Sequence, residues 1–270
     1  MVEQLKPLET VDLNIVPPVA YVTLNRPDVR NAMNGQMVTE LQTVFYALRE
    51  NRDIRAIVLS GAGGAFCAGG DINELRDAMQ NPAGSMNTDH NFERLIQAVN
   101  QAPQVVIARV EGAALGGGLG LVCVSDIAIA STDARFGMPE VRLGVVPSFI
   151  SPYVIQRLGL TRARELILTG RQFDGTQAKE YGLVHEVCSP EKLDDCVDAV
   201  VDDIRQCGPY GLAAAKALIF EVLEKSPDQT LEYRAQLLDT IRRSPEAQEG
   251  MLAFMQKRPP TWAVERDDDP

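Results

Sequence analysis

Short apolar runs rich in β-branched residues alternate with amphipathic stretches through the first 130 residues. Residues 19–24 and 54–59 are β-rich, and between them residues 36–51 carry apolar side chains at helical spacing, which predicts a strand, a helix and a strand. Two further apolar runs occupy residues 105–110 and 127–130. Strands as continuously apolar as these fit a sheet that helices cover on both faces, so we predict an α/β fold.

The pattern changes after about residue 160, where helical periodicity dominates and one short strand is predicted at 183–187. Thr161, Asp174 and the pair Ser244–Pro245 are typical of helix starts. We therefore predict an α/β N-terminal part and a helical C-terminal part. Six helices are predicted, at residues 161–168, 174–181, 190–204, 208–223, 229–241 and 245–257.

Two segments have the composition of irregular structure. Residues 81–89 (NPAGSMNTD) interrupt an otherwise helical stretch, and we predict a loop there that is able to act as a mobile lid. The last residues, 267–270, are expected to be a solvated, frayed end.

Composition and charge restrict the class of protein. The 270 residues are 45% hydrophobic, which fits one large domain or a domain with an extension. With 37 acidic and 26 basic residues the formal net charge is −11, which opposes general attraction to nucleic acid or to an anionic membrane. An anionic ligand would therefore need a local basic patch.

Targeting and metal-binding signals are weak. The first ten residues do not resemble a signal peptide, and no stretch reaches the ~18 apolar residues of a membrane span, so we predict a cytoplasmic protein. The five cysteines are scattered and only two histidines are present, so we expect neither a disulfide framework nor a metal site.

Two glycine clusters, GAGGAFCAGGDI at 61–72 and GAALGGGLG at 112–120, each follow a predicted strand and enter a predicted helix. Glycine allows close approach of a ligand to the backbone, and the first N–H groups of a helix are free donors. Each cluster alone is better explained by turn chemistry or tight packing. Neither has the dinucleotide-binding or Walker pattern in its required setting. The pattern alone indicates a small-molecule enzyme, with an acyl group as one candidate substrate.

Eight motifs, in order along nearly the whole chain, resemble those of the crotonase (enoyl-CoA hydratase/isomerase) superfamily. They are LNRPDVRNA (24–32), AFCAGGDI (65–72), GAALGGG (112–118), SDIAI (125–129), FGMPE (136–140), LTG (168–170), AKEYGLV (178–184) and EGMLAFMQKR (249–258).

The resemblance implies a spiral of ββα units at residues 1–200, with the coenzyme A site, and a C-terminal helical trimerisation region at 201–270. It implies homotrimers, often stacked as hexamers. It also implies that the carbonyl oxygen of a CoA thioester accepts hydrogen bonds from two backbone N–H groups, which fall on Gly70 and Gly117. Coenzyme A is then part of the substrate, and no separate cofactor is expected.

The resemblance also assigns contacts to coenzyme A. Arg26, Arg30, Lys257 and Arg258 would supply the local positive field, although each is equally explained as a solvated surface charge. Phe254 and Lys257 would reach CoA from a neighbouring subunit. The expected contact residues are Val29, Arg30, Ala68, Asp71, Ile72, Phe254 and Lys257.

Typical hydratases of this family hold the water with two glutamates, and the chain has only one of them. Glu140 lies in the Pro-Glu motif, whereas the other position is Gly120. One carboxylate suffices if it takes a proton from the attacking water and returns a proton to Cα. Without the resemblance, Glu140 would be better explained by a salt bridge with Arg142 or by a helix-end contact.

Glycine at position 120 is expected to open volume beside Cβ and to remove a negative charge, which favours a β-branched substrate with its own carboxylate. The segment PSFISPYV at 147–154 is similar to bacterial 3-methylglutaconyl-CoA and isohexenylglutaconyl-CoA hydratases. We therefore predict reversible hydration of a β-branched glutaconyl-CoA, in leucine or terpene catabolism. Candidates for orienting water or the distal carboxylate, each also explained as a turn, cap, packing or surface residue, are Ser148, Ser151, Tyr153 and Arg142.

Two other functions remain open. A Δ3,Δ2-enoyl-CoA isomerase needs the same single acid/base and no water. A non-catalytic acyl-CoA-binding or RNA-binding homologue is the second alternative, and the charge of −11 argues against RNA.

Overall fold

The computed structural model describes residues 7–80 and 82–263, and a six-stranded sheet forms its centre. The first two strands are antiparallel, and every later neighbour is parallel. In sheet order the strands are β1 (Val11–Val16), β2 (Val19–Leu24), β3 (Ala56–Gly61), β4 (Val105–Val110), β6 (Ile127–Ser131) and β9 (Glu186–Cys188).

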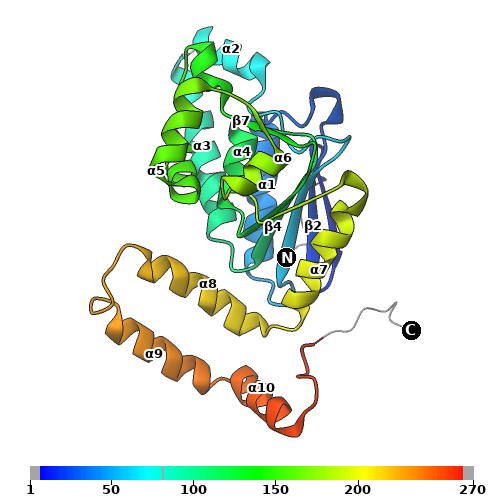
Figure 1. Ribbon diagram of the computed structural model, residues 1–270, viewed down its shortest axis with the longest axis vertical. Coiled ribbons are helices and arrows are strands. Elements are labelled where there is room, and N and C mark those ends of the chain that lie inside the picture. Colours follow the sequence, from blue (N-terminus) through cyan, green and yellow to red (C-terminus); the bar gives the residue numbers. More distant parts are fainter. Residues whose placement is uncertain (1–6, 81, 264–270) are drawn as a thin grey trace.

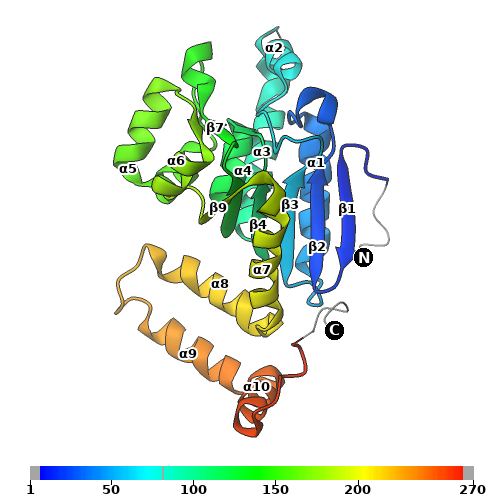
Figure 2. The same cartoon turned by 45° about the vertical axis from the view of Figure 1, so that its right-hand side comes forward.

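Both faces of this sheet are covered, as the apolar runs predict. Within β3, Ile57 and Leu59 pack into the main core, whereas Ala56 and Val58 pack into a second cluster on the opposite face. Helices α1 (Gly35–Arg49) and α3 (Pro82–Asn100) lie behind the sheet, and α7 (Leu193–Arg205) lies in front of it (Figure 2). Two-sided burial explains why these strands lack polar alternation.

A second, three-stranded sheet consists of β5 (Ala113–Leu115), β7 (Arg135–Gly137) and β8 (Phe173–Asp174). Strand β4 of the large sheet is followed by β5 of the small sheet and then by helix α4 (Gly117–Val124). Strand β6 is followed in the same way by β7 and by the 3₁₀ helix η3 (Pro139–Leu143), which leads to α5 (Ser151–Thr169). This repeated order of two strands and a helix confirms the expected mixed α/β crotonase fold.

The C-terminal helices α8 (Pro209–Leu223), α9 (Leu231–Arg242) and α10 (Pro245–Gln256) lie beyond the lower end of the sheet (Figure 1). Lys216 of α8, which is 7% exposed, pairs with Asp126 at 2.6 Å. Arg55 donates to the carbonyl oxygens of Arg205 at 2.6 Å and Cys207 at 3.1 Å, just before α8 begins. These buried charges attach the helical tail to the core.

Most predicted helix starts are confirmed. Asp174 caps α6 (Gly175–Glu180) with a reciprocal capping box to Gln177. Ser244 caps α10, with Pro245 in its first turn. Helix α5 instead begins at Ser151, ten residues before the predicted start, and Gly159 (φ 71°) interrupts it. The interruption explains why periodicity indicates only the second half of this helix.

The expected lid is not a loop. Residue 81 lies outside the described residues, and residues 82–89 form the first half of α3, directly after α2 (Ile72–Gln80). Proline at the first position of a helix has no intrahelical hydrogen bond to lose and has φ already near the helical value, so Pro82 starts a helix here. The predicted strand at 183–187 is also shifted, since β9 begins at Glu186.

The cysteines differ from expectation in one place. We expect no disulfide framework, and one disulfide is present, between Cys188 of β9 and Cys196 of α7. Sequence spacing cannot show this contact, because it depends on how α7 packs across the end of β9.

Candidate active site

The two glycine clusters meet side by side. Cys67 pairs with Ala114 of β5, through bonds from Cys67 N to Ala113 O at 2.7 Å and from Leu115 N to Cys67 O at 2.9 Å. Gly70 is three residues beyond Cys67, and Gly117 is three residues beyond Ala114. The two segments run parallel from this bridge, so Gly70 and Gly117 lie equally far beyond it along their segments.

Close contact between the two turns requires glycine. Gly69 has φ 101°, and a Cβ placed on it would lie 3.1 Å from Leu115 O, closer than ordinary contact. Gly116 also has φ 50° and ψ −120°, a conformation that side chains oppose. The glycine junction, as we call residues 69–70 and 116–117, therefore depends on missing side chains.

The junction presents two free N–H groups. Gly117 is the first residue of α4, where no intrahelical acceptor exists, and Gly70 lies between Met33 N→Gly69 O and Asp71 N→Met33 O. Within the described residues neither the Gly70 nor the Gly117 N–H donates to an acceptor. Gly70 is exposed and Gly117 partly exposed.

Glu140 lies against this junction. The 3₁₀ helix η3 begins at Pro139 and directs the Glu140 side chain so that a Cβ on Gly116 would lie 3.0 Å from its Oε1. Among the described residues the other oxygen, Oε2, is buried with no hydrogen-bond partner. Burial raises the pKa of the Glu140 carboxyl above its usual value. The carboxylate is thus close to the free N–H groups, with one oxygen available.

The alternative role for Glu140, a salt bridge with Arg142, is not observed. Arg142 Nε donates to Thr169 O at 3.1 Å, and its side chain packs over Gly170 at the C-terminus of α5. A cation there stabilises the last carbonyls of the helix. Arg142 is therefore a helix-end contact, and its expected role toward a distal carboxylate stays a prediction.

The expected open volume at Gly120 is also wrong. A Cβ on Gly120 would lie 2.3 Å from Ile150 Cγ2 and 3.6 Å from Ile96 Cδ1. Ile150 precedes the first residue of α5 and is 3% exposed. An aliphatic side chain thus fills the space that the sequence leaves empty.

Two apolar residues that the sequence does not single out lie at the junction. A Cβ on Gly117 would lie 2.7 Å from Met33 Cε and 3.1 Å from Phe92 Cζ. Phe149 meets the Phe92 ring edge-on, with ring centroids 6.4 Å apart. In the sequence, Phe92 occurs at helical spacing with core residues of α3, so nothing separates it from ordinary packing.

The remaining acyl-pocket candidates have local partners. Ser148 is exposed, and Ser151 Oγ donates to Ser148 O at 3.1 Å, which is a turn contact. Tyr153 OH donates to Glu93 Oε1 at 3.1 Å, and burial followed by the Glu93 charge raises the Tyr153 pKa to about 12. A substrate carboxylate at Tyr153 would meet the like charge of Glu93, which opposes that assignment.

The expected CoA segment borders the junction. Ala68 N donates to Arg30 O at 2.9 Å, which fixes the Val29–Arg30 turn beside the first glycine cluster. Val29 and Arg30 are exposed. Buried Asn31, missed by sequence analysis, donates to Ala62 O at 2.9 Å and Ala65 O at 2.7 Å and so holds the turn in place.

Asp71 and Ile72 have different surroundings. Asp71 is 8% exposed, pairs with Arg26 Nη1 at 2.9 Å and accepts from Asn73 N at the start of α2. Arg26 is therefore not available as a free cation for CoA. Ile72 is 67% exposed beside it and remains a candidate contact.

Phe254 is on α10 and Lys257 directly follows it, and α10 lies at the opposite end of the molecule from α2, which begins at Ile72 (Figure 1). Phe254 is 86% exposed. Arg258 forms a two-bond contact with Glu249, at 2.6 and 2.9 Å, so it also is not a free cation. The expected contact of Phe254 and Lys257 with CoA from a neighbouring subunit stays a prediction.

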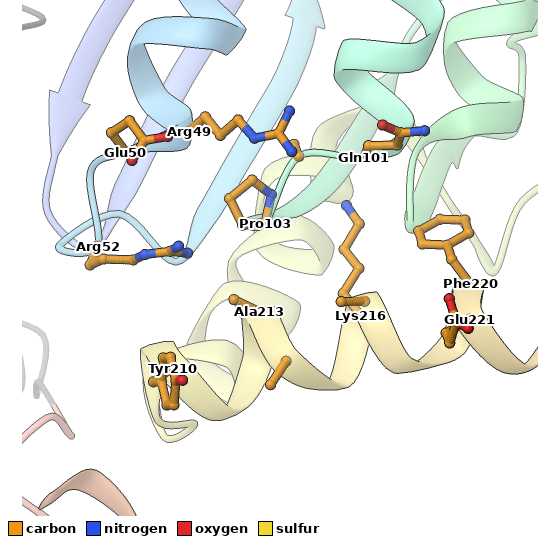
Figure 3. A pocket seen from close by; sticks show the side chains of 13 residues that line it. Arg49, Glu50, Arg52, Gln101, Pro103, Tyr210, Ala213, Lys216, Phe220 and Glu221 are labelled. Atoms are coloured by element: carbon orange, nitrogen blue, oxygen red, sulfur yellow. The ribbon is translucent and has the colours of Figure 1, made fainter. Parts of the chain in front are cut away.

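A separate cavity of 570 Å³ lies between α8 and the ends of α1 and α3. Lys216 points from α8 toward the segment with Gln101 and Pro103 (Figure 3). Because the cavity contains no residue of the glycine junction and not Glu140, it is distinct from the candidate active site.

One group of possible metal ligands occurs in the described part of the chain. Glu186, Cys188 and Cys196 have ligand atoms within 4.8 Å of one another, but the two sulfurs are joined in the disulfide. No helix between residues 7 and 263, residue 81 excepted, is long and apolar enough to cross a membrane.

The chain is similar to proteins named for enoyl-CoA chemistry. It is 35% identical over 245 residues to "Probable enoyl-CoA hydratase echA8" of Mycobacterium bovis, covering 90% of this chain and 94% of that protein. It is 33% identical over 276 residues to the peroxisomal "Delta(3,5)-Delta(2,4)-dienoyl-CoA isomerase" of Arabidopsis thaliana, covering 97% and 98%. Among solved structures, Pseudomonas aeruginosa AtuE superimposes with a TM-score of 0.92 at 43% identity, covering 95% of this chain and 100% of AtuE.

The family model for enoyl-CoA hydratase/isomerase matches residues 15–265, which include both glycine clusters, Glu140 and the C-terminal helices. Fold, site and similarity agree, and the chain is an enzyme of the enoyl-CoA hydratase/isomerase family.

Proposed function

We propose that this enzyme catalyses the reversible hydration of a 2-enoyl-CoA thioester, with Glu140 as its single acid/base. The observation that carries this function is the position of the Glu140 carboxylate against Gly116, with Oε2 unpartnered among the described residues. An acid/base must lie within hydrogen-bond reach of the reacting atoms, and the contact of Glu140 with Gly116, directly before Gly117, supports such a position.

In this mechanism the thioester oxygen accepts from the Gly70 and Gly117 N–H groups. Water attacks Cβ, Glu140 takes one proton from that water, and the electron pair of the double bond moves toward Cα and the thioester oxygen. Glu140 then returns a proton to Cα, which gives the 3-hydroxyacyl-CoA. Preorganised donors stabilise the developing enolate, and the loss of one donor typically costs about 3 kcal/mol of transition-state stabilisation.

Burial helps Glu140 to act in both directions. Because its pKa is raised, the carboxylate is a stronger base than an ordinary glutamate, and its acid form is easier to reach near neutral pH. The free Gly117 N–H at the start of α4 adds the positive end of a helix dipole beside the enolate oxygen.

Coenzyme A is proposed to bind along the turn at Val29 and Arg30, with Ala68 and Ile72 beside it. Phe254 and Lys257 would complete the site from a neighbouring subunit in a homotrimer or a hexamer. Large exposed apolar side chains on the C-terminal helices, including Phe254 (86%), Met255 (70%), Ile219 (61%) and Met251 (60%), support burial of this surface by another copy.

For the acyl group we propose a β-branched glutaconyl-CoA of the 3-methylglutaconyl or isohexenylglutaconyl type. The absence of a second carboxylate at position 120 supports a substrate that carries its own negative charge. The volume argument for Gly120 no longer contributes, because Ile150 fills that space. Activity on 3-methylglutaconyl-CoA no higher than on crotonyl-CoA would remove this substrate class.

Isomerisation of a 3-enoyl-CoA to a 2-enoyl-CoA is the second candidate. It is favoured by the single carboxylate and by similarity to a protein named as a dienoyl-CoA isomerase. A 3-enoyl-CoA incubated in ¹⁸O-labelled water separates the two reactions. A hydratase leaves the unconjugated 3-enoyl-CoA unchanged and gives labelled 3-hydroxyacyl-CoA only from a 2-enoyl-CoA, whereas an isomerase converts the 3-enoyl-CoA to unlabelled 2-enoyl-CoA.

The main function is tested with a panel of straight, branched and carboxylated 2-enoyl-CoA thioesters. Hydration is measured as the loss of absorbance of the conjugated enoyl group. We expect hydration by the wild type and by Glu165→Gln, an α5 control whose carboxylate pairs with Arg162 and Arg171. We expect Glu140→Gln to lose at least about 100-fold in kcat. Full activity of Glu140→Gln would contradict the proposed mechanism.

A further inference from the structure

Ile150 fills the space into which a side chain at position 120 would project, although the two residues belong to different elements. A Cβ on Gly120 would lie 2.3 Å from Ile150 Cγ2 and 3.1 Å from Ile150 Cβ, distances at which the two side chains cannot coexist. The residues are on α4 and at the cap of α5, so the contact is tertiary.

Neither element can withdraw easily. Gly118 of α4 packs on the first glycine cluster so closely that a Cβ there would lie 2.6 Å from Cys67 O. Ile150 is held by the first turn of α5, where Val154 N donates to Ile150 O at 2.9 Å, and it is 3% exposed. In a close-packed interior such an overlap displaces a side chain or shifts a helix.

The shared site lies beside the catalytic candidate. Gly120 N donates to Gly116 O at 3.0 Å, so the two glycines are one helical turn apart and share a face of α4. Gly116 faces Glu140, and Gly120 faces Ile150 and Ile96. One helical turn beyond the glycine that faces Glu140, the space into which a side chain at position 120 would project is therefore lined by the aliphatic side chains of Ile150 and Ile96.

We propose that Ile150 is a specificity-determining residue that excludes any side chain at position 120 and limits the size of the alkyl group accepted at the substrate Cβ. This inference rests on the proposed function for the location of Cβ beside Glu140. Ile150 thereby keeps the site to one carboxylate, because a glutamate at position 120 has no space while Ile150 is present.

Double substitutions test the exclusion. We expect Gly120→Ala to lower Tm by roughly 2–10 °C through overpacking. Leucine has one carbon on its Cβ where isoleucine has two, so Ile150→Leu removes the colliding Cγ2, whereas Ile150→Val retains it. We therefore expect Gly120→Ala/Ile150→Leu to regain at least half of the lost Tm, and Gly120→Ala/Ile150→Val to regain none.

Three results would overturn the exclusion: a Gly120→Ala protein with wild-type Tm, equal rescue by leucine and valine, or no rescue by either. If Gly120→Ala is insoluble, soluble expression replaces Tm as the measurement. Soluble protein from the leucine double variant but not from the valine one then supports the exclusion, and the same outcome for both overturns it.

A substrate comparison tests the specificity. The measured quantity is kcat/KM for a 2-enoyl-CoA with a longer alkyl group on Cβ, divided by kcat/KM for crotonyl-CoA. We expect Ile150→Ala to raise this ratio by about 10-fold or more, as for other hydrophobic pockets. Ile129→Ala is the control, since Ile129 is fully buried on the far face of the sheet and its loss should leave this ratio unchanged.

An unchanged ratio in Ile150→Ala, or an equal change in the control, would overturn the specificity role. These outcomes do not depend on Glu140. Full activity of Glu140→Gln would refute the proposed function and leave the Tm coupling between positions 120 and 150 intact.

Discussion

Gly116→Ala is expected to damage catalysis more than stability. Gly116 has φ 50° and ψ −120°, and an alanine in such a sparsely allowed conformation costs about 1–3 kcal/mol. For a domain of this size the loss lowers Tm by roughly 2–12 °C. The new methyl group would also lie 3.0 Å from Glu140 Oε1, closer than ordinary contact, so the carboxylate must move.

The effect on rate follows from that displacement. A catalytic group misplaced by about 1 Å can lose about 100-fold in rate, and relief of a 3.0 Å contact needs several tenths of an ångström. We therefore expect kcat for hydration to fall by about 10- to 100-fold. Initial rates with a saturating 2-enoyl-CoA and thermal unfolding by circular dichroism measure the two effects separately.

Gly182→Ala is the matched control. Gly182 has φ 77°, and a Cβ there would meet no atom within 4 Å, so the substitution introduces backbone strain without touching Glu140. We expect a lower Tm and a kcat within about twofold of the wild type. If Gly116→Ala and Gly182→Ala have the same kcat, the contact between position 116 and the carboxylate has no catalytic consequence.

Three further predictions concern pH and stability. Burial raises the pKa of Glu140, and the base form of the carboxylate is the one that adds water. The acidic fall of kcat/KM should therefore be centred at a higher pH than the pKa of 4.5 of an ordinary glutamate. A fall of kcat/KM centred at or below pH 4.5 would contradict this prediction. Lys216→Met removes the buried cation that pairs with the partly buried Asp126. Urea unfolding should show a loss of about 2 kcal/mol or more, against less than about 0.5 kcal/mol for Lys225→Met in an exposed pair. Burial lowers the pKa of His185, so neutral His185 stabilises the fold above pH 6.5, and this contribution is lost as pH falls through the lowered pKa. The urea midpoint of His185→Gln should therefore fall less steeply with acid than that of the wild type.

The sequence predicts the central strands and several helix ends because their causes are local. Ile57 and Leu59 on one face and Val58 on the other need only apolar character to mark a strand buried on both sides. Edge strand β1 escapes that criterion, since its apolar residues alternate with Asp12 and Asn14. Loop composition likewise mispredicts residues 82–89, where Pro82 can begin a helix.

The sequence predicts only those parts of the candidate site that depend on the residue type at a single position. The glycine clusters and Glu140 are visible in the sequence because backbone approach and acid/base chemistry need those residue types. Ile150 is not, because its contact with Gly120 depends on how α5 enters the core. The same holds for Arg142, whose contact with the end of α5 joins residues 27 positions apart.

Glu140→Gln, measured for both rate and binding, tests the central claim most directly. Glutamine keeps the shape of the side chain but cannot act as a base at neutral pH. With the thioester still held by the Gly70 and Gly117 N–H groups, Kd for the product 3-hydroxyacyl-CoA should change by less than about threefold while kcat falls at least about 100-fold. Unchanged kcat, or a loss of binding as large as the loss of rate, would contradict a lone carboxylate that moves protons beside an amide-bound thioester.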